Sequence, residues 1–118
     1  MRLSFIEAED FTGIWTKLGL TVDDLFSLQN LIGPDPTIHP VVRGTGGLRK
    51  MRFAKPSSGK GKRGSFRVCF VYFHGLSTVV LVWVYPKNQK SDLTAAEKKG
   101  VRRWIDHVEQ ELSQHFGF

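Results

Sequence analysis

The sequence predicts an α+β domain: a small antiparallel β-sheet with helices packed on one face, and elements in the order β-α-α-β-β-β-α. Three observations favour this class. Two apolar patterns with helical spacing stand near the N-terminus, three strand-like segments follow one another in the middle of the chain, and a long amphipathic pattern ends it. Consecutive strands joined by short turns are typical of an antiparallel meander. The 118 residues suffice for one domain, residues 1–118.

The N-terminal segment predicts one strand and two helices. Residues 3–7 are expected to form a short strand beside the other three. Residues 8–18 carry apolar side chains at helical spacing: Phe11, Ile14, Trp15 and Leu18. Thr21 can cap the second helix, with Asp24 at its third position, where a carboxylate suits the helix dipole. Residues 33–36, Gly-Pro-Asp-Pro, end that helix.

The middle of the chain predicts three strands in succession. Residues 48–54 alternate between two faces, and residues 65–74 and 78–85 follow as the second and third strands. Gly75 stands in the turn between the last two, and Pro86 ends the third. The run Gly-Thr-Gly-Gly before the first strand is expected to be a flexible entry to it, because no helix follows as a phosphate-binding loop requires.

The C-terminal segment predicts a long helix. Thr94 and Glu97 have the spacing of a capping box, which favours a helix start at this point. The helix is expected to reach about residue 114, because apolar residues form one stripe: Val101, Trp104, Ile105, Val108 and Leu112. The three tryptophans of the chain fall on apolar faces and are expected in the core.

Charge is distributed unevenly along the chain. No aspartate or glutamate occurs in the 56 residues between Asp35 and Asp92, which contain eleven of the seventeen lysines and arginines. This segment carries a net charge of +11, whereas the rest of the chain, with six basic and eleven acidic residues, carries −5. Such a field attracts polyanions, and the alternation of bases with strand-forming residues indicates a surface that binds and positions phosphates.

Several basic residues of this segment are candidates for binding. Alternation places Lys50 and Arg52 on one face of the first meander strand and Arg49 on the other. Arg67 lies among apolar residues of the next strand, and a half-buried guanidinium there needs a partner. The loop of residues 55–64 is expected to bind RNA backbone without sequence preference, through Lys55, Lys60, Lys62 and Arg63. A basic strand face is more often a solvated surface than an active site, so these residues alone leave the function open.

Other features argue against several kinds of site. Cys69 is the single cysteine and lies in a strand, so it is expected to be a buried small side chain and not a nucleophile. The histidines are too scattered to suggest a metal site. An acid within the first seven residues does not fit a signal peptide, and the longest apolar run, residues 79–85, is too short for a membrane span. The sequence therefore predicts a cytoplasmic protein with no membrane, metal, cofactor or small-molecule ligand.

Three short sequence motifs follow one another between residues 43 and 99. They are Arg-Gly-Thr-Gly-Gly-Leu-Arg-Lys-Met-Arg at residues 43–52, Gly-Lys-Arg-Gly and then Phe-Arg-Val within residues 61–68, and Tyr-Pro-Lys-Asn-Gln-Lys-Ser-Asp-Leu-Thr leading into Ala-Glu-Lys-Lys within residues 85–99. Over roughly residues 40–105 the chain resembles the RelE/HigB superfamily of bacterial toxins, most of all its HigB-like branch. The resemblance implies a RelE-like fold and the toxin of a type II toxin–antitoxin pair, a ribosome-dependent endoribonuclease that cleaves messenger RNA. It also implies a cognate antitoxin, in this branch often a helix-turn-helix protein.

The resemblance implies particular catalytic residues. The superfamily keeps two cations at alternate positions of its second strand, which Lys50 and Arg52 match. It keeps an arginine early in its third strand, which Arg67 matches. A further cation after the last strand corresponds to Lys87 or, less closely, to Lys90.

One position departs from the family pattern. The superfamily's tyrosine near the start of the C-terminal segment has no match here, because Thr94 stands near its place. Tyr85 is expected to supply an aromatic contact to RNA instead. The departure affects the base-stacking part of the implied site and leaves the phosphate-binding part intact.

The acid-free segment favours RNA cleavage by cations alone. The ribose 2′-OH can attack the adjacent phosphate without a metal or cofactor, and the segment offers no carboxylate for proton transfer. Lys50 is the leading candidate for the general base, since like charge from neighbouring arginines favours a neutral amine. Arg67 is the candidate clamp on the transition state, with Arg52 as its partner and Lys87 as a proton donor or phosphate ligand.

Two other functions stay open. The related ParE branch poisons DNA gyrase on the same fold and lacks this cationic site, so the chain could be a toxin without nuclease activity. A nucleic-acid-binding module that cuts nothing is the second alternative.

Overall fold

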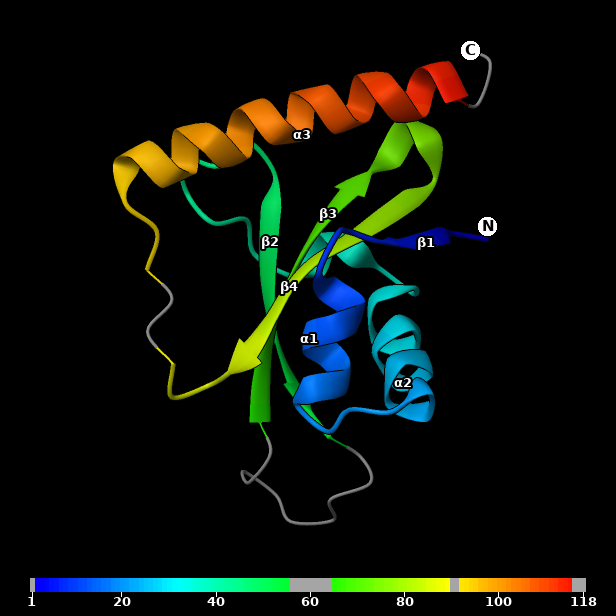
Figure 1. Ribbon diagram of the computed structural model, residues 1–118. Helices are drawn as coiled ribbons and strands as arrows, with labels where there is room; N and C mark the ends of the chain where they lie inside the picture. The colour runs from blue at the N-terminus through cyan, green and yellow to red at the C-terminus, as the bar shows by residue number, and fades with distance from the viewer. Residues whose placement is uncertain (1, 56–64, 90–91, 116–118) are drawn as a thin grey trace.

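The computed structural model describes residues 2–55, 65–89 and 92–115, and it shows a four-stranded sheet between two layers of helix (Figure 1). The elements, in chain order, are β1 (Ser4–Glu7), α1 (Phe11–Lys17), α2 (Val22–Ile32), β2 (Leu48–Ala54), β3 (Ser65–Phe73), β4 (Thr78–Pro86) and α3 (Ala95–His115). None of these helices combines the length and the apolar character that a membrane crossing requires. The α+β class and the predicted order of elements are confirmed.

The sheet is mixed and not wholly antiparallel. Its strand order is β1-β4-β3-β2, and the predicted meander of β2, β3 and β4 is antiparallel throughout. β1 pairs with β4 in parallel, with Ser4 opposite Thr78, so the prediction of an antiparallel sheet is wrong at this edge. The reason lies in the connection: α1 and α2 carry the chain from β1 to β2 at the opposite edge, and a helical crossover returns the chain in the same direction. β4 runs the same way as β2, because two antiparallel steps separate them.

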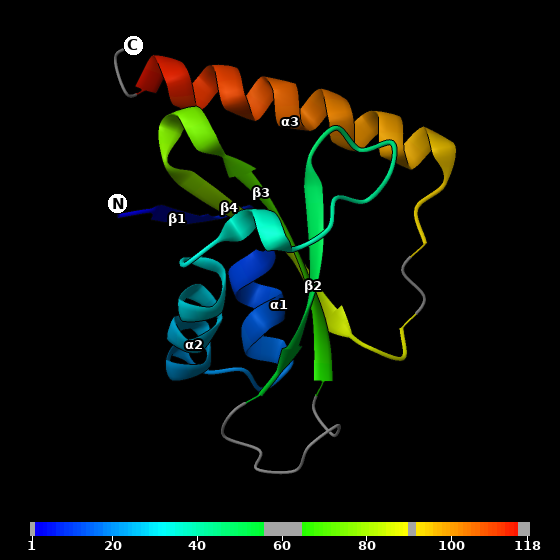
Figure 2. The ribbon, with the colours of Figure 1, turned by 180° about the vertical axis from the view of Figure 1, so that it is seen from behind.

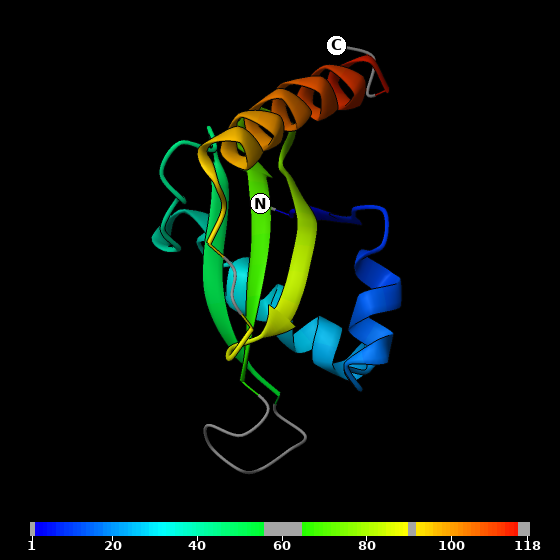
Figure 3. The same ribbon diagram turned by 60° about the vertical axis from the view of Figure 1, so that its left-hand side comes forward.

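Helices cover both faces of the sheet, so the prediction that they pack on one face is wrong (Figure 3). α1 and α2 pack over a core cluster that contains Met51, Phe53, Val68, Phe70 and Leu81. α3 crosses the other face near one end of the strands, over a cluster that contains Leu48, Val71, Phe73, Val80 and Val82. Residues 78–82 of β4 are all buried, and such an uninterrupted run is typical of a strand that is covered on both faces.

A β-bulge divides β4. The register between β3 and β4 shifts between Cys69 and Phe70, which leaves Val82 as an extra residue in β4. Because side chains alternate along a strand, one extra residue transfers every later side chain to the opposite face. Val84 therefore lies in the cluster under α1 and α2, and Tyr85 lies in the cluster on the α3 side.

Aromatic contacts and a helix cap hold the crossover against the sheet. Phe11 stacks on Trp15 with ring centroids 5.6 Å apart, and the Trp15 ring lies 5.7 Å from that of Phe53 in β2. The predicted N-cap of α2 is confirmed. The Asp24 backbone N–H donates to Thr21 Oγ1 (3.1 Å), and the Thr21 N–H donates to the Asp24 carboxylate (2.8 Å).

The loop that leads into β2 is fixed and is not the flexible entry that the sequence suggests. The Val42 N–H donates to Leu48 O at 2.7 Å, and the fully buried Thr45 donates its hydroxyl to Val42 O at 2.7 Å. Gly44 has a φ of +88°, and a Cβ at this position would lie 3.2 Å from Lys98 Cδ of α3. Glycine suits the left-handed backbone here, and its lack of a Cβ leaves room for the Lys98 side chain. Figure 2 shows the loop before β2 beside α3.

Candidate nucleic-acid interface

α3 crosses one sheet face near one end of the strands and leaves the rest of that face without a helix over it (Figure 3). Three of the predicted cations, Lys50, Arg52 and Arg67, lie on this face. The register of β2 and β3 places Arg52 directly opposite Arg67 and Lys50 opposite Cys69. Arg67 in turn pairs with Tyr85 of β4. Residues directly opposite in an antiparallel pair share one face, with Cβ atoms about 4.5–5.5 Å apart. The structure therefore brings the two cations of β2, the arginine of β3 and the tyrosine of β4 to the same face.

The three cations line a single cavity of about 570 Å³, called here the cationic cavity. The connector before β2 forms another part of its wall, since the Lys50 N–H donates to Pro40 O at 3.0 Å and holds this segment along the strand. A polyanion that enters the cavity meets three positive side chains at once. Its lining residues are His39, Pro40, Val41, Val42, Lys50, Met51, Arg52 and Arg67.

Arg52 and Arg67 form a like-charge pair across two strands. Like charges directly opposite each other destabilise a sheet. Among the described residues no carboxylate forms an ion pair with either arginine, and Arg67 Nη1 donates to Phe66 O at 3.3 Å. The pair therefore lacks a counter-charge within the described part of the chain, and a phosphate group would supply one.

Lys50 lies beside an aromatic ring and a buried thiol. Its Nζ atom is 5.8 Å from the centroid of the Tyr85 ring, within the range of a cation–π contact. Burial raises the pKa of the Cys69 thiol to about 11, although the Lys50 charge and a hydrogen bond with Tyr85 act in the opposite direction. The thiol is thus protonated at neutral pH and only 4% exposed, which agrees with the prediction of a buried small side chain.

A second cavity, of about 180 Å³, adjoins the cationic cavity, because Lys50 and Val42 line both. Asp92, from the segment before α3, and Lys98, from α3 itself, bring two further charges to it. It is called here the Asp92 cavity, and its lining residues are Val42, Leu48, Lys50, Cys69, Trp83, Tyr85, Asp92, Leu93 and Lys98. The sequence did not point to Asp92 or Lys98, because only the docking of α3 on the sheet brings them to β2.

Arg49 and Lys55 make structural contacts instead of joining this face. Arg49 Nη1 donates to the carbonyl oxygens of Thr37 (3.1 Å) and His39 (2.7 Å), so it ties the connector to β2. Lys55 Nζ donates to Gly19 O at 2.7 Å. The structure does not bring the predicted RNA-binding residue Arg49 to the cationic cavity.

The other predicted cations lie at the margin of the described chain or beyond it. Lys87 follows β4, its backbone N–H donates to Ser65 O at 3.2 Å, and its exposed side chain lines neither cavity. Four predicted RNA-binding residues lie outside the described residues: Lys60, Lys62, Arg63 and Lys90.

His39 lines the cationic cavity, a position that the sequence did not indicate. Its ring meets the ring of Phe70 edge-on, with centroids 5.7 Å apart. Its Nε2 atom is buried and has no hydrogen-bond partner among the described residues. The imidazole thus forms part of the wall and does not present Nε2 to the open side.

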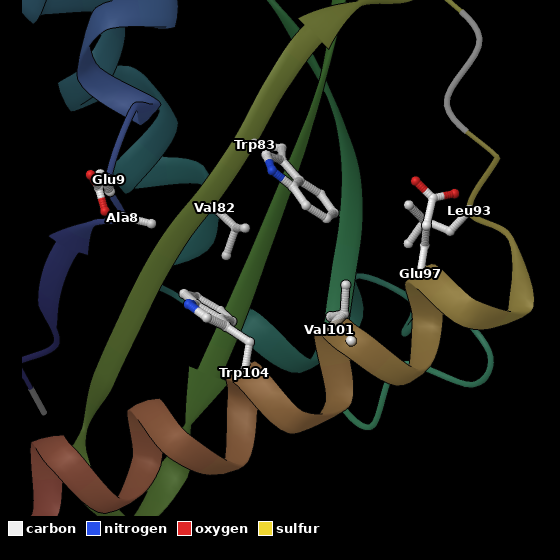
Figure 4. Close-up of a pocket in the computed structure, with 9 residues that line it drawn as sticks. Ala8, Glu9, Val82, Trp83, Leu93, Glu97, Val101 and Trp104 are labelled. Carbon is white, nitrogen blue, oxygen red and sulfur yellow. The ribbon is translucent and has the colours of Figure 1, made fainter.

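A third cavity, of about 420 Å³, lies between β4 and α3 (Figure 4). Val82 and Trp83 line it from β4, and Val101 and Trp104 line it from α3. Trp83 is 36% exposed, so the prediction that every tryptophan lies in the core is wrong for this residue. The bulge is the reason, because it places two successive residues of β4 on the α3 side. Trp83 and Leu93 line both this cavity and the Asp92 cavity.

Within the described ranges, no group of three or more His, Cys, Asp or Glu side chains is arranged to hold a metal ion. No protein-family model matches the chain. The candidate site is therefore defined by the geometry and charge of its own side chains.

Proposed function

We propose that this protein is a metal-independent endoribonuclease that cleaves messenger RNA on the ribosome, as the toxin of a type II toxin–antitoxin pair. The observation that carries the proposal is that Lys50, Arg52 and Arg67 line one cavity. The resemblance to the RelE/HigB superfamily supports the biological setting. The proposed place of action is the cytoplasm, where ribosomes and messenger RNA are found.

RNA carries its own nucleophile, so the protein has to supply proton transfer and charge stabilisation. The ribose 2′-oxygen attacks the adjacent phosphorus while a base takes the 2′-proton. The bond from phosphorus to the 5′-oxygen of the next nucleotide breaks, and that oxygen takes up a proton. The products are a 2′,3′-cyclic phosphate and a free 5′-hydroxyl. Negative charge gathers on the phosphorane oxygens between these steps, and cations that are already in place stabilise it.

Each cation of the site has a proposed role. Arg52 and Arg67 stand opposite each other, so their guanidinium groups can bind non-bridging oxygens of one phosphate. Lys50 lines the same cavity as the two arginines and is the proposed base. Lys87 remains the candidate proton donor or phosphate ligand, although its side chain lines neither cavity.

Substitution of the cations tests the reaction. Lys50→Ala and Arg67→Ala should each slow cleavage at least about a hundredfold, the usual scale of a general base or an electrostatic stabiliser. The measurement is the appearance of new mRNA ends in a ribosome-programmed reaction, read by primer extension. Lys99→Ala is the matched control, because it removes one positive charge from an exposed position of α3 outside both cavities. Unchanged cleavage in both site variants would exclude these residues as catalytic groups.

Cleavage should depend on the ribosome. The cations bind phosphate without regard to sequence, so RNA has to be positioned by something else, and the ribosome holds mRNA in a defined path. We expect slow cutting of protein-free RNA and faster cutting when the same RNA is bound to ribosomes. Vigorous cutting of naked RNA would contradict ribosome dependence while leaving the nuclease proposal intact.

Expression in cells distinguishes the proposal from the two alternatives. Transcript ends within codons support the nuclease, gyrase-linked DNA breaks would indicate a gyrase inhibitor, and RNA binding without growth arrest would indicate a simple binding module. The proposed antitoxin should offset the positive surface with acidic or phosphate-like groups, or block access to the ribosome by its bulk. Co-expression with the neighbouring open reading frame should then restore growth.

A further inference from the structure

The Asp92 cavity differs from the cationic cavity in size and chemistry. Its volume of about 180 Å³ lies below the roughly 300–1,000 Å³ of pockets for drug-sized ligands, so it suits one planar ring system. Trp83 and Tyr85 line it with aromatic rings, on which RNA bases stack. Lys50 lines both cavities, so a group bound in one lies directly beside a group bound in the other.

Asp92 is the one carboxylate among the residues that line these two cavities. Its negative charge opposes phosphate binding, because it shares a small cavity with the lysine that a phosphate would contact. No hydrogen bond or ion pair joins Asp92 to another described residue, and the cap of α3 is made by Thr94 and Glu97 instead. A carboxylate placed in this way suits a neutral group that carries hydrogen-bond donors.

Lys98 adds the complementary group. Its alkyl chain is held against the loop before β2, since a Cβ at Gly44 would lie 3.2 Å from Lys98 Cδ. An ammonium group only donates hydrogen bonds, whereas an ionised carboxylate only accepts them. The cavity thus offers an acceptor, a donor and two aromatic rings. This set complements a base with donors on one edge and acceptors on the adjacent edge.

We propose that the Asp92 cavity binds a guanine base of the RNA, next to the phosphate in the cationic cavity; this inference rests on the proposed function. Guanine carries two neighbouring donors, N1–H and the N2 amino group, for the two oxygens of one carboxylate, and its O6 and N7 accept from an ammonium. Adenine and cytosine place a ring-nitrogen acceptor beside their amino group. Uracil flanks its N3–H with two carbonyl oxygens. Each of the other bases therefore turns an acceptor towards the carboxylate.

Nucleotide binding tests this inference without any cleavage. The probes are the 3′- and 5′-monophosphates of the four nucleosides, titrated into the full chain and followed by NMR chemical shifts. A guanosine monophosphate should bind about tenfold more tightly than the others, the scale of one bidentate base contact. Asp92→Asn should lower this preference to below about threefold, because its amide offers one acceptor in place of two. Lys99→Ala should leave the preference unchanged. Equal affinity for the four bases, or a guanine preference that survives Asp92→Asn, would overturn the inference.

Mapping of mRNA cleavage sites separates this inference from the proposed function. Wild-type cuts should be enriched beside guanine, and Asp92→Asn should lose the enrichment while it still cuts, since the cationic cavity is intact. Wild-type cuts that ignore base identity would overturn the guanine assignment and leave the nuclease standing. A wild-type protein that cuts no RNA would overturn the nuclease, and the nucleotide titration would then decide the base site alone.

Discussion

Arg52 and Arg67 stand opposite each other in adjacent strands, and neither forms an ion pair with a described carboxylate. Such a pair lowers the stability of the free protein. A sheet face under selection for folding alone would place an opposite charge at one of these positions. At the scale of the single residue, the requirements of the proposed phosphate binding and of folding are therefore opposed.

Removal of one charge should separate these two requirements. Arg52→Gln keeps much of the alkyl stem and removes the like-charge repulsion, so the free energy of unfolding should rise by about 0.2–1 kcal/mol. Cleavage should fall in the same variant. The measurement is the urea midpoint at low salt, with Arg103→Gln on the exposed side of α3 as the control. A loss of stability in Arg52→Gln would show that the arginine is held by a favourable contact and not strained by its neighbour.

The start of α3 is the element that positions the Asp92 cavity. The Glu97 N–H donates to Thr94 Oγ1 (3.1 Å), and the Thr94 N–H donates to Glu97 Oε1 (2.9 Å), so the predicted capping box is confirmed. These bonds fix where the helix begins, two residues after Asp92. The cap therefore determines how the carboxylate of the cavity is held relative to β2.

The stability of this cap should depend on pH. The hydrogen bond from the Thr94 backbone, followed by that from its side chain, lowers the pKa of Glu97 from its ordinary value of 4.5. A lowered pKa in the folded protein means that the ionised cap stabilises the fold above pH 4.5 and loses this effect as the pH falls through the folded value. Glu97→Gln should therefore lower the urea midpoint at neutral pH and have little effect well below pH 4.5. Glu109→Gln, at an exposed position of the same helix, is the control, and an equal deficit at both pH values would point to lost packing.

The elements themselves were predictable because their signals are local. Alternation in β2, the cap at Thr21 and the stripe of α3 each depend on a few neighbouring residues. The parallel pairing of β1 and the placement of α3 on the second face depend on contacts between distant segments. The bulge at Val82 has no local signal at all, since the run of residues 79–84 has the composition of a strand in either register.

The candidate site was predictable in part for the same reason. A period of two placed Lys50 and Arg52 on one face, and the register with β3 then brings Arg67 opposite the second of them. Asp92 and Lys98 reach the site only because α3 docks on the sheet, and no residue spacing in the sequence predicts that docking. The sequence therefore predicts a site made of cations alone, whereas the two adjoining cavities of the folded protein contain one carboxylate, that of Asp92.

At the scale of the whole molecule, the charge is polarised. The segment between Asp35 and Asp92 carries +11 and the rest of the chain carries −5. The strands β2 and β3 collect the cations of this segment that line the cationic cavity. The field should therefore draw the protein to RNA before any specific contact forms, and this attraction should weaken as salt increases.

The salt dependence of RNA binding should report the phosphate contacts. Each contact with single-stranded RNA contributes about 0.7 to the slope of log K against log salt concentration. Arg67→Ala should lower the slope by about that amount, because its guanidinium is a proposed phosphate ligand, and Lys99→Ala should not change it. The measurement is fluorescence anisotropy with a 2′-O-methyl oligonucleotide, which cannot be cut. A slope that is the same in Arg67→Ala and the wild type would place the bound phosphate away from the cationic cavity.

The extra residue Val82 changes the face of the sheet on which the odd-numbered side chains of β4 lie. Before it, odd-numbered side chains face α1 and α2, and after it they face Lys50. A regular ladder that kept all these residues, with Val82 opposite Cys69, would set Val84 opposite Arg67 and turn the Tyr85 ring to the layer of α1 and α2. The bulge thus decides which side chains of β4 lie beside Lys50, so exchange of one aromatic side chain for another should be tolerated here, whereas a shift of the β3–β4 register should not.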